Sequence, residues 1–184
     1  MSKVTFITGN QGKADFLAKH IGYPVDHRKI ELDEIQSLDL AEIVEHKARQ
    51  AYEKIKSPVL VEDIGASLDA MDGLPGPFIK WFESALGLAG ICELADKLGD
   101  RSAEVKICFG YFDGHDMKLF KGQVRGQIPA QPIGESGFGF DPIFIPEGHD
   151  KTYAQMNEGE REKYSVRSSQ IYPAIKEFLE SLNR

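Results

Sequence analysis

Residues 59–65, VLVEDIG, constrain the fold and the function more than any other stretch of the chain. Three apolar residues of strand-forming type lead directly into Glu62, Asp63 and a glycine, a pattern typical of a buried strand that ends at a polar crevice. Ligands of open α/β sheets bind in such crevices. Because successive strand side chains point to opposite faces, the two carboxylates share one site only if the strand has already ended. We expect one to act on a ligand and the other to support it; the alternative is that both are solvated loop residues.

The length and the charge of the chain limit the classes of function. A chain of 184 residues is long enough for one domain with a substantial core. The 22 basic and 29 acidic residues give a net charge of −7, which argues against an extended surface for a nucleic acid polymer. A phosphate-bearing ligand must then be bound by a local cluster of donors or with the help of a cation.

The cysteines and the apolar runs favour a cytoplasmic protein. Cys92 and Cys108 lack the spacing of metal ligands and are predicted to be buried thiols, which fits a reducing compartment. The first residues pass directly into a predicted strand, so we expect no signal peptide. No apolar run reaches membrane-spanning length, so we expect no membrane contact.

A predicted strand over residues 4–7 is followed by a glycine-containing turn and then by helical apolar spacing over residues 14–21. Such a turn presents backbone N–H groups and the positive end of the helix dipole, both of which suit an anion. The anion-binding candidates in the turn are Thr8, Gly9, Asn10, Gly12 and Lys13. The motif differs from a Walker P-loop, and an ordinary turn with a surface lysine is the alternative.

Residues 30–37 are rich in acidic side chains and predict a strand or an extended segment. Asp39 and Glu42 then have the spacing of a helix cap, ahead of a long amphipathic helix that ends before Pro58. Lys47 falls on the apolar face of this helix, so its ammonium either reaches the rim or points toward an anion. We favour the second interpretation because the helix leads into the strand with the carboxylates.

Pro77 is suited to the first position of a further helix, which is followed by a second helical pattern over residues 91–98. The predicted buried stripe of the first helix is Phe78, Trp81, Phe82 and Ala85. We expect this stripe to form core or dimer contacts, with a base-stacking platform as the alternative. Lys80 lies off this stripe, facing either a ligand or solvent.

From residue 103 the apolar period changes to two. Residues 105–111 alternate, Asp113 and Gly114 predict a hairpin turn, and residues 117–124 predict the returning strand. Residues 125–128 are expected to continue this antiparallel region. In residues 134–144, glycine-spaced aromatics precede Asp141, which suggests rings that stack on a planar ligand beside an acceptor for a base or ribose. A purely structural loop is the alternative. A polar stretch with Arg161 and Arg167 precedes a closing helix over residues 171–182.

Five segments resemble, in order and spacing, those of the inosine triphosphate pyrophosphatase family. They are residues 8–13, 61–63, 73–82, 137–144 and 151–156. The resemblance covers essentially the whole chain and implies an α/β fold: an elongated mixed sheet flanked by helices, with two lobes and a central nucleotide-binding cleft. Residues 1–184 would form one domain without independent parts. The resemblance also implies a homodimer and Mg²⁺-dependent cleavage of ITP, dITP and XTP to a monophosphate and pyrophosphate.

The resemblance further assigns roles to individual residues. Asp63 resembles the residue that activates water, Glu34 a metal-associated carboxylate and Lys47 a phosphate-contacting lysine. Lys13 and Lys47 would stabilise charge on the departing pyrophosphate, and Glu34 and Asp63 would hold Mg²⁺. The residues expected to bind substrate are Thr8, Gly9, Asn10, Gly12, Lys13, Lys47, Lys80, Phe138, Phe140, Asp141, Arg161, Ser165 and Arg167.

One departure from the family pattern concerns the base. Family members usually carry Ser-His-Arg before the last helix, whereas this chain has Val166 between Ser165 and Arg167, and valine cannot donate to a 6-oxo group. Arg161 also stands where a lysine is common. Two alternatives follow: the same chemistry on another modified nucleotide, or a nucleotide-binding module with little turnover.

Overall fold

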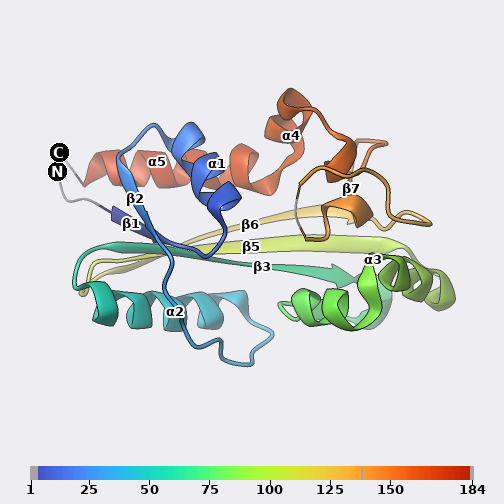
Figure 1. The fold of residues 1–184 in the computed structure, drawn as a ribbon, viewed down its shortest axis with the longest axis horizontal. Coiled ribbons are helices and arrows are strands. Elements are labelled where there is room, and N and C mark those ends of the chain that lie inside the picture. Colours follow the sequence, from blue (N-terminus) through green and yellow to red (C-terminus); the bar gives the residue numbers. More distant parts are fainter. Residues whose placement is uncertain (1–3, 138, 183–184) are drawn as a thin grey trace. The chain divides into compact units, whose positions relative to one another are not determined.

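The structure, a computed structural model, describes residues 4–137 and 139–182. In these residues a seven-stranded mixed sheet is accompanied by five α-helices (Figure 1), so the predicted α/β class with a mixed, helix-flanked sheet is confirmed. The strands are β1 (Val4–Ile7), β2 (Val25–Arg28), β3 (Val59–Leu68), β4 (Pro75–Gly76), β5 (Ser102–Phe112), β6 (Met117–Gln127) and β7 (Ile145–Pro146). The α-helices are α1 (Gln11–Ile21), α2 (Leu40–Ile55), α3 (Ile79–Leu98), α4 (Glu158–Tyr164) and α5 (Tyr172–Ser181).

The sheet has the order β2-β1-β3-β5-β6-β7, with β4 paired to β3 off this path. β1 pairs in parallel with both β2 and β3, whereas β4 and β7 pair antiparallel with β3 and β6. The parallel pairs are connected through α1 and α2, as parallel neighbours require a crossover. β3, the strand with Glu62 and Asp63, lies between β1 and β5 and is therefore an interior strand of the sheet.

The contacts divide the chain into two compact units, and neither is a continuous stretch. The first unit contains the residues up to Asp63, Ile107–Gly122 and the chain from Arg167 onward; the second contains Ile64–Lys106 and Gln123–Val166. β3, β5 and β6 each contribute residues to both units. That the chain forms one domain without independently folding parts stays a prediction.

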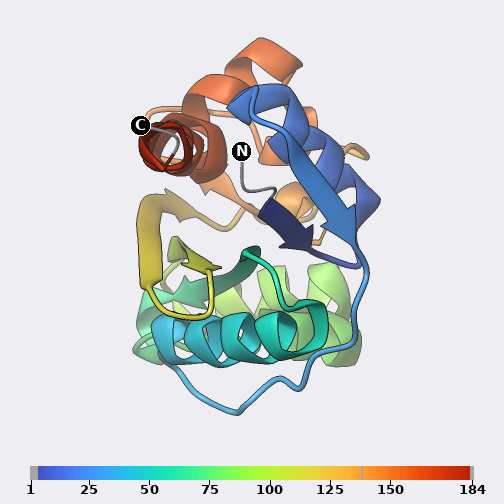
Figure 2. The same cartoon turned by 90° about the vertical axis from the view of Figure 1, so that its left-hand side faces the viewer.

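The first unit is a layered arrangement of helices on both faces of its strands. α1 and α5 lie on one face and α2 on the other (Figure 2). Phe16 of α1 packs against Tyr172 at a ring-centroid distance of 5.8 Å, which joins the two helices of one face. On the other face, a Cβ added to Gly110 would lie 2.5 Å from Cγ1 of Val44, so only glycine lets α2 approach β5 this closely. The buried core on this side contains Ile7, Val44, Ala48, Ala51, Val59, Val61, Cys108 and Phe112.

Several predicted elements of the first unit are confirmed. Asp39 caps α2, its carboxylate accepting a hydrogen bond from the amide of Ala41 at 2.8 Å. β5 and β6 are joined by the short turn at Asp113, as a hairpin requires. Cys108 of this unit is a buried free thiol, as is Cys92 of the second unit. α5 carries a proline in its first turn, and its buried residues are Tyr172, Ile175 and Leu179.

Two expectations about strands differ from the structure. Residues 30–37 contain no strand, so of the two forms predicted for this segment only the extended one remains; the edge strand that pairs with β1 is β2, which lies earlier in the chain and is only partly buried. β3 does not end before Gly65 but continues to Leu68, so both carboxylates lie within the strand. A Cβ on Gly65 would lie 2.8 Å from the carbonyl carbon of Gly76, so the glycine is needed where β4 pairs with β3.

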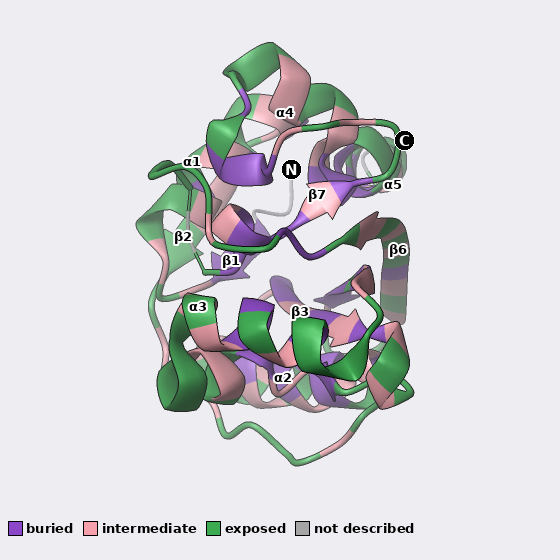
Figure 3. Cartoon of the chain, turned by 90° about the vertical axis from the view of Figure 1, so that its right-hand side faces the viewer, coloured by how far each residue is buried: buried purple, intermediate pink, exposed green. Residues whose placement is uncertain are grey.

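The prediction for α3 was partly wrong. This helix begins at Ile79 rather than Pro77. Its backbone leaves the helical conformation at Gly87, so the two predicted helical patterns lie on either side of a kink. Ile79 is buried, whereas Trp81 is 63% exposed, so the predicted aromatic stripe does not form the core. Exposed residues cover much of α3 (Figure 3).

α4 was not predicted. It begins with a capping box in which Asn157 and Glu160 each accept a hydrogen bond from the other's backbone N–H. It contains Arg161, one of the predicted substrate-binding residues.

Candidate active site

The turn that follows β1 is shaped by its own side chains. Asn10 is the N-cap of α1, and its Oδ1 accepts a hydrogen bond from the amide of Lys13 at 3.2 Å. The hydroxyl of Thr8 accepts one from the amide of Asn10 at 3.1 Å. A Cβ on Gly12 would lie 3.3 Å from Oδ1 of Asn10, so a side chain there would crowd the cap. The backbone of the turn from Thr8 to Lys13 is therefore fixed by contacts of Thr8 and Asn10 and by the small size of Gly12. Lys13 is the residue of this turn that carries an ammonium group.

The ammonium of Lys13 forms an ion pair with Glu62 of β3. Arg167, in the π-helical segment Arg167–Ile171, donates to the same carboxylate through Nε and Nη2, each at 3.2 Å. Burial by itself raises the pKa of Glu62, but the charges of Arg167 and Lys13 outweigh it and lower the pKa to about 2. Glu62 is therefore a buried carboxylate held between two cations.

A second cluster is centred on Lys47 of α2. Its ammonium lies 2.8 Å from Oε1 of Glu34 and 2.6 Å from Oδ2 of Asp63. Burial lowers the pKa of Lys47, but the charge and hydrogen bond of Asp63, together with Glu34, outweigh it and raise the pKa. Lys47 thus pairs with two carboxylates of the protein rather than extending to the rim, and its contact with a phosphate stays a prediction.

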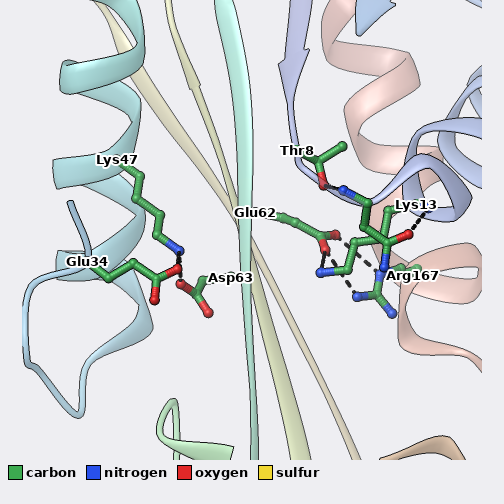
Figure 4. Close-up of polar contacts among 8 residues, drawn as sticks. Thr8, Lys13, Glu34, Lys47, Glu62, Asp63 and Arg167 are labelled. Atoms are coloured by element: carbon green, nitrogen blue, oxygen red, sulfur yellow. Dashed lines mark hydrogen bonds and ion pairs between the residues drawn. The ribbon is translucent and has the colours of Figure 1, made fainter. Parts of the chain in front are cut away.

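The two clusters lie on opposite sides of β3. Figure 4 shows Glu62 with Lys13 and Arg167 on one side of the strand, and Asp63 with Lys47 and Glu34 on the other. This follows from the alternation of side chains along a strand that continues past both residues. Glu62 and Asp63 therefore lie in different environments, and that one of them acts on a ligand while the other supports it stays a prediction.

The second unit contains the residues predicted to recognise the base. Asp141 is 4% exposed, and its Oδ2 accepts a hydrogen bond from Nη2 of Arg161 at 2.6 Å. Arg161 also donates to the carbonyl of Tyr153 and lies over its ring, 5.4 Å from the centroid. Phe140 is 8% exposed and packs edge-on against Phe144. Asp141 and Arg161 are thus brought together, while the base-stacking role of Phe140 stays a prediction.

Two further candidates have different surroundings. Lys80 is exposed, with its ammonium 5.9 Å from the centroid of the Trp81 ring. Ser165 is buried, and its amide donates to the carbonyl of Arg161 at the end of α4. Phe138 lies outside the described residues.

Comparison with known proteins identifies the group to which this arrangement belongs. A model of the Ham1 family matches residues 4–180. The chain belongs to the Ham1 family.

Two relatives and one solved structure illustrate the similarity of this Ham1-family chain. Inosine triphosphate pyrophosphatase 2 of Trypanosoma cruzi is 42% identical over 175 residues, covering 92% of this chain and 88% of the relative. The dITP/XTP pyrophosphatase of Saccharolobus solfataricus is 38% identical over 182 residues, covering 97% and 94%. The structure of the Staphylococcus aureus Ham1 protein superposes with a TM-score of 0.78 at 29% identity, covering 98% of this chain and 99% of that one. The resemblance drawn from the five motifs is confirmed.

Two acidic residues of this Ham1-family chain have partners or neighbours that the sequence did not predict. Glu62 was singled out, but its pairing with Lys13 and Arg167 was not predicted. Glu83 of α3 lies close to Gly139: a Cβ added to that glycine would be 3.5 Å from Oε1 of Glu83. Burial and the charge of Asp141 raise the pKa of Glu83. Strand alternation placed Glu62 opposite Asp63, whereas no sequence signal indicated Glu83.

The Lys47 cluster suits a divalent cation of the magnesium type. Among the described residues, no group of three or more His, Cys, Asp or Glu side chains is arranged to hold a metal ion. Mg²⁺, however, is usually bound by one or two carboxylates, with waters and substrate phosphates as the other ligands. Glu34 and Asp63 both direct an oxygen at one ammonium, so two carboxylates already converge on a single positive charge. The donor set therefore fits Mg²⁺ carried with a nucleotide.

Proposed function

We propose that this protein is a nucleoside triphosphate pyrophosphohydrolase that removes non-standard purine nucleotides. ITP, dITP and XTP would be cleaved to the monophosphate and pyrophosphate. The observation that carries the proposal is the convergence of Glu34 and Asp63 on Lys47 in a Ham1-family chain. Its relatives include proteins named inosine triphosphate pyrophosphatase and dITP/XTP pyrophosphatase.

The residues around Asp63 supply the groups that hydrolysis at the α-phosphorus requires. Asp63 is 17% exposed and accepts from Lys47, so one carboxylate is both oriented by a partner and open to a water molecule. We assign to it the removal of a proton from the attacking water. Lys47 neutralises charge beside it and contacts the phosphates.

The turn from Thr8 to Lys13 would hold the departing pyrophosphate. Its backbone is fixed by the cap at Asn10, and the helix dipole of α1 adds partial positive charge. Lys13 supplies the full charge that offsets the negative charge growing on the leaving group.

Mg²⁺ is the implied cofactor, and Glu34 and Asp63 are the residues that would hold it. When bound, it neutralises the triphosphate and polarises the phosphoryl group under attack. The chain itself provides the orientation of both carboxylates through Lys47.

Recognition of the base is assigned to Asp141, Arg161 and Phe140. The buried Asp141 pairs with the partly buried Arg161, so the two present both an acceptor and a donor, and Phe140 supplies an aromatic ring. Val166 is 3% exposed and cannot donate a hydrogen bond, so discrimination at the 6-position must use other groups. The names of the relatives do not favour the alternative substrate classes.

A panel assay tests the proposal. Purified protein with Mg²⁺ is given ITP, XTP, dITP, ATP, GTP and a pyrimidine triphosphate, and the release of pyrophosphate and orthophosphate is measured separately. Pyrophosphate from ITP, dITP and XTP, with little from ATP, is expected. Preference for another base would change the substrate assignment, and binding without pyrophosphate release would overturn the enzymatic one.

The homodimer, the cytoplasmic location and the absence of a nucleic acid partner are predictions from the sequence and the resemblance. None of the helices in the described residues is long and apolar enough to cross a membrane. We propose a homodimer as the active form, and the molar mass in solution, measured by light scattering, tests it.

A further inference from the structure

The contacts of Glu62 point to a role that the steps of hydrolysis do not require. Its carboxylate pairs with the Lys13 ammonium and accepts two hydrogen bonds from Arg167. The three side chains come from β3, from the first turn of α1 and from the segment before α5. Their exposed fractions are 3% for Glu62, 8% for Arg167 and 20% for Lys13. Lys13 is therefore the member of this cluster that a ligand reaches most readily.

The charges of the cluster leave one net positive charge, because two cations share one carboxylate. Arg167 fixes the carboxylate with a two-point contact, and the carboxylate in turn holds Lys13. A lysine side chain is long and flexible, so an ammonium held before the ligand arrives loses less freedom on binding. Arg167 thus acts as the anchor, and Glu62 as the link between the anchor and Lys13.

The geometry argues against Glu62 as a ligand of a metal. Its side chain lies across β3 from Asp63 and Glu34 (Figure 4). Both of its oxygens already accept from cations, and a divalent ion would add a third cation to the same buried place.

We propose that Glu62 is a positioning residue, which holds the Lys13 ammonium at the first turn of α1 for the phosphate end of the nucleotide and takes no part in metal binding. The inference rests on the proposed function for the identity of the anion. It does not depend on turnover, because the positioned group binds the phosphates whether or not the bond is cleaved.

A double-mutant cycle on binding tests the inference. Inorganic tripolyphosphate with Mg²⁺ is the probe, and its affinity is measured by calorimetry for the wild type, Glu62→Gln, Lys13→Met and the double variant. We expect Lys13→Met to weaken binding about tenfold, the loss of one charge-assisted contact, and Glu62→Gln to weaken it by a smaller factor. The double variant should bind as Lys13→Met does, because Glu62 acts through Lys13.

Two further variants make the cycle decisive. Glu62→Asp keeps the charge and should fall between the wild type and Glu62→Gln; if Glu62→Gln does not fold, Glu62→Asp takes its place in the cycle. Glu177→Gln, at an exposed position of α5, should bind as the wild type does.

Three outcomes would overturn the inference. The first is that the factors by which Glu62→Gln and Lys13→Met weaken binding multiply in the double variant. The second is that Glu62→Gln needs more Mg²⁺ for binding and Lys13→Met does not. The third is that the wild type does not bind tripolyphosphate. Failure of the proposed function would give a different result. In that case the wild type binds tripolyphosphate and the double-mutant cycle is non-additive, but no nucleotide yields pyrophosphate. This result would refute the proposed enzymatic activity and would leave the positioning role of Glu62 intact.

Discussion

Glu62 and Asp63 are consecutive residues of β3, yet their carboxylates lie on opposite sides of the strand and pair with different lysines (Figure 4). Glu62 is buried between Lys13 and Arg167, whereas Asp63 shares Lys47 with Glu34. The strand thereby separates a carboxylate with two fixed cationic partners from one that remains partly open to water.

Asp63→Asn should lower kcat by about 10²–10⁴-fold, the range for loss of a general base. The amide cannot take a proton from water, but it keeps the size of the side chain, so nucleotide binding should largely remain. Steady-state release of pyrophosphate and equilibrium binding of the nucleotide measure the two effects. Asp116→Asn, in the exposed hairpin turn, serves as the control and should be unaffected. Near-normal rates in Asp63→Asn would show that water is activated elsewhere.

Lys47→Met should leave Glu34 and Asp63 without their shared ammonium. In metal-free buffer we expect a loss of roughly 1–3 kcal/mol in the free energy of unfolding, less than for a fully buried pair because Glu34 is 54% exposed. Added Mg²⁺ should then stabilise the variant more than the wild type, since it meets two unshielded carboxylates. Thermal unfolding over a Mg²⁺ titration measures this, with Lys118→Met on the exposed side of β6 as the control. Equal Mg²⁺ shifts in all three proteins would contradict the assignment of Glu34 and Asp63 as metal ligands.

Stability at acidic pH should report on Glu62. Its pKa is about 2 in the folded protein against an ordinary value of 4.5, so the folded state favours the charged form. This stabilisation is fully present above the ordinary pKa and is lost as the pH falls through the folded pKa. The free energy of unfolding of the metal-free wild type, relative to Glu62→Gln, should therefore decrease by on the order of 3 kcal/mol between pH 4.5 and pH 2. Urea unfolding at a series of pH values measures the difference, and parallel curves for the two proteins would refute the ion-paired state of Glu62.

Gly65→Ala should destabilise the protein by about 1–3 kcal/mol, because its methyl group would lie 2.8 Å from the carbonyl carbon of Gly76 in the paired strand β4. Gly159→Ala in α4 is the matched control: its methyl would lie 3.6 Å from Oδ1 of Asn157, an ordinary contact. The control should be neutral or slightly stabilising. Denaturant unfolding of both variants tests the contrast, and an unperturbed Gly65→Ala would show that β4 can move away.

The alternation of side chains made part of the site predictable. A strand that carries two adjacent carboxylates must separate them, and the structure does so at Glu62 and Asp63. Lys47 was likewise predictable, since a lysine on an apolar helix face needs a partner, and it has two. What the sequence did not show was that β3 continues beyond Gly65, because the glycine is required by β4 rather than by a strand end.

Other features depended on contacts that a linear pattern does not record. Arg167 and Glu62 are 105 residues apart, and no local signal joins them. The apolar residues of α3 occur around the whole helix, so periodicity alone could not decide that Ile79 would be buried and Trp81 exposed. α4 had a usable signal, because Asn157 and Glu160 have the spacing of a capping box.

The assignment of roles along β3 depends on whether a position is odd or even. Deletion of one residue of β3 before Glu62 would move the side chains of Glu62 and Asp63 to the opposite faces of the strand. Each carboxylate would then face the partners of the other, although the residues of the site would be almost unchanged. Substitutions can thus adjust either side of the strand independently over evolutionary time. An insertion or deletion in this segment would have to change the length by two residues to keep both carboxylates on their own faces. Insertions and deletions should therefore be far rarer here among functional descendants than single-residue replacements.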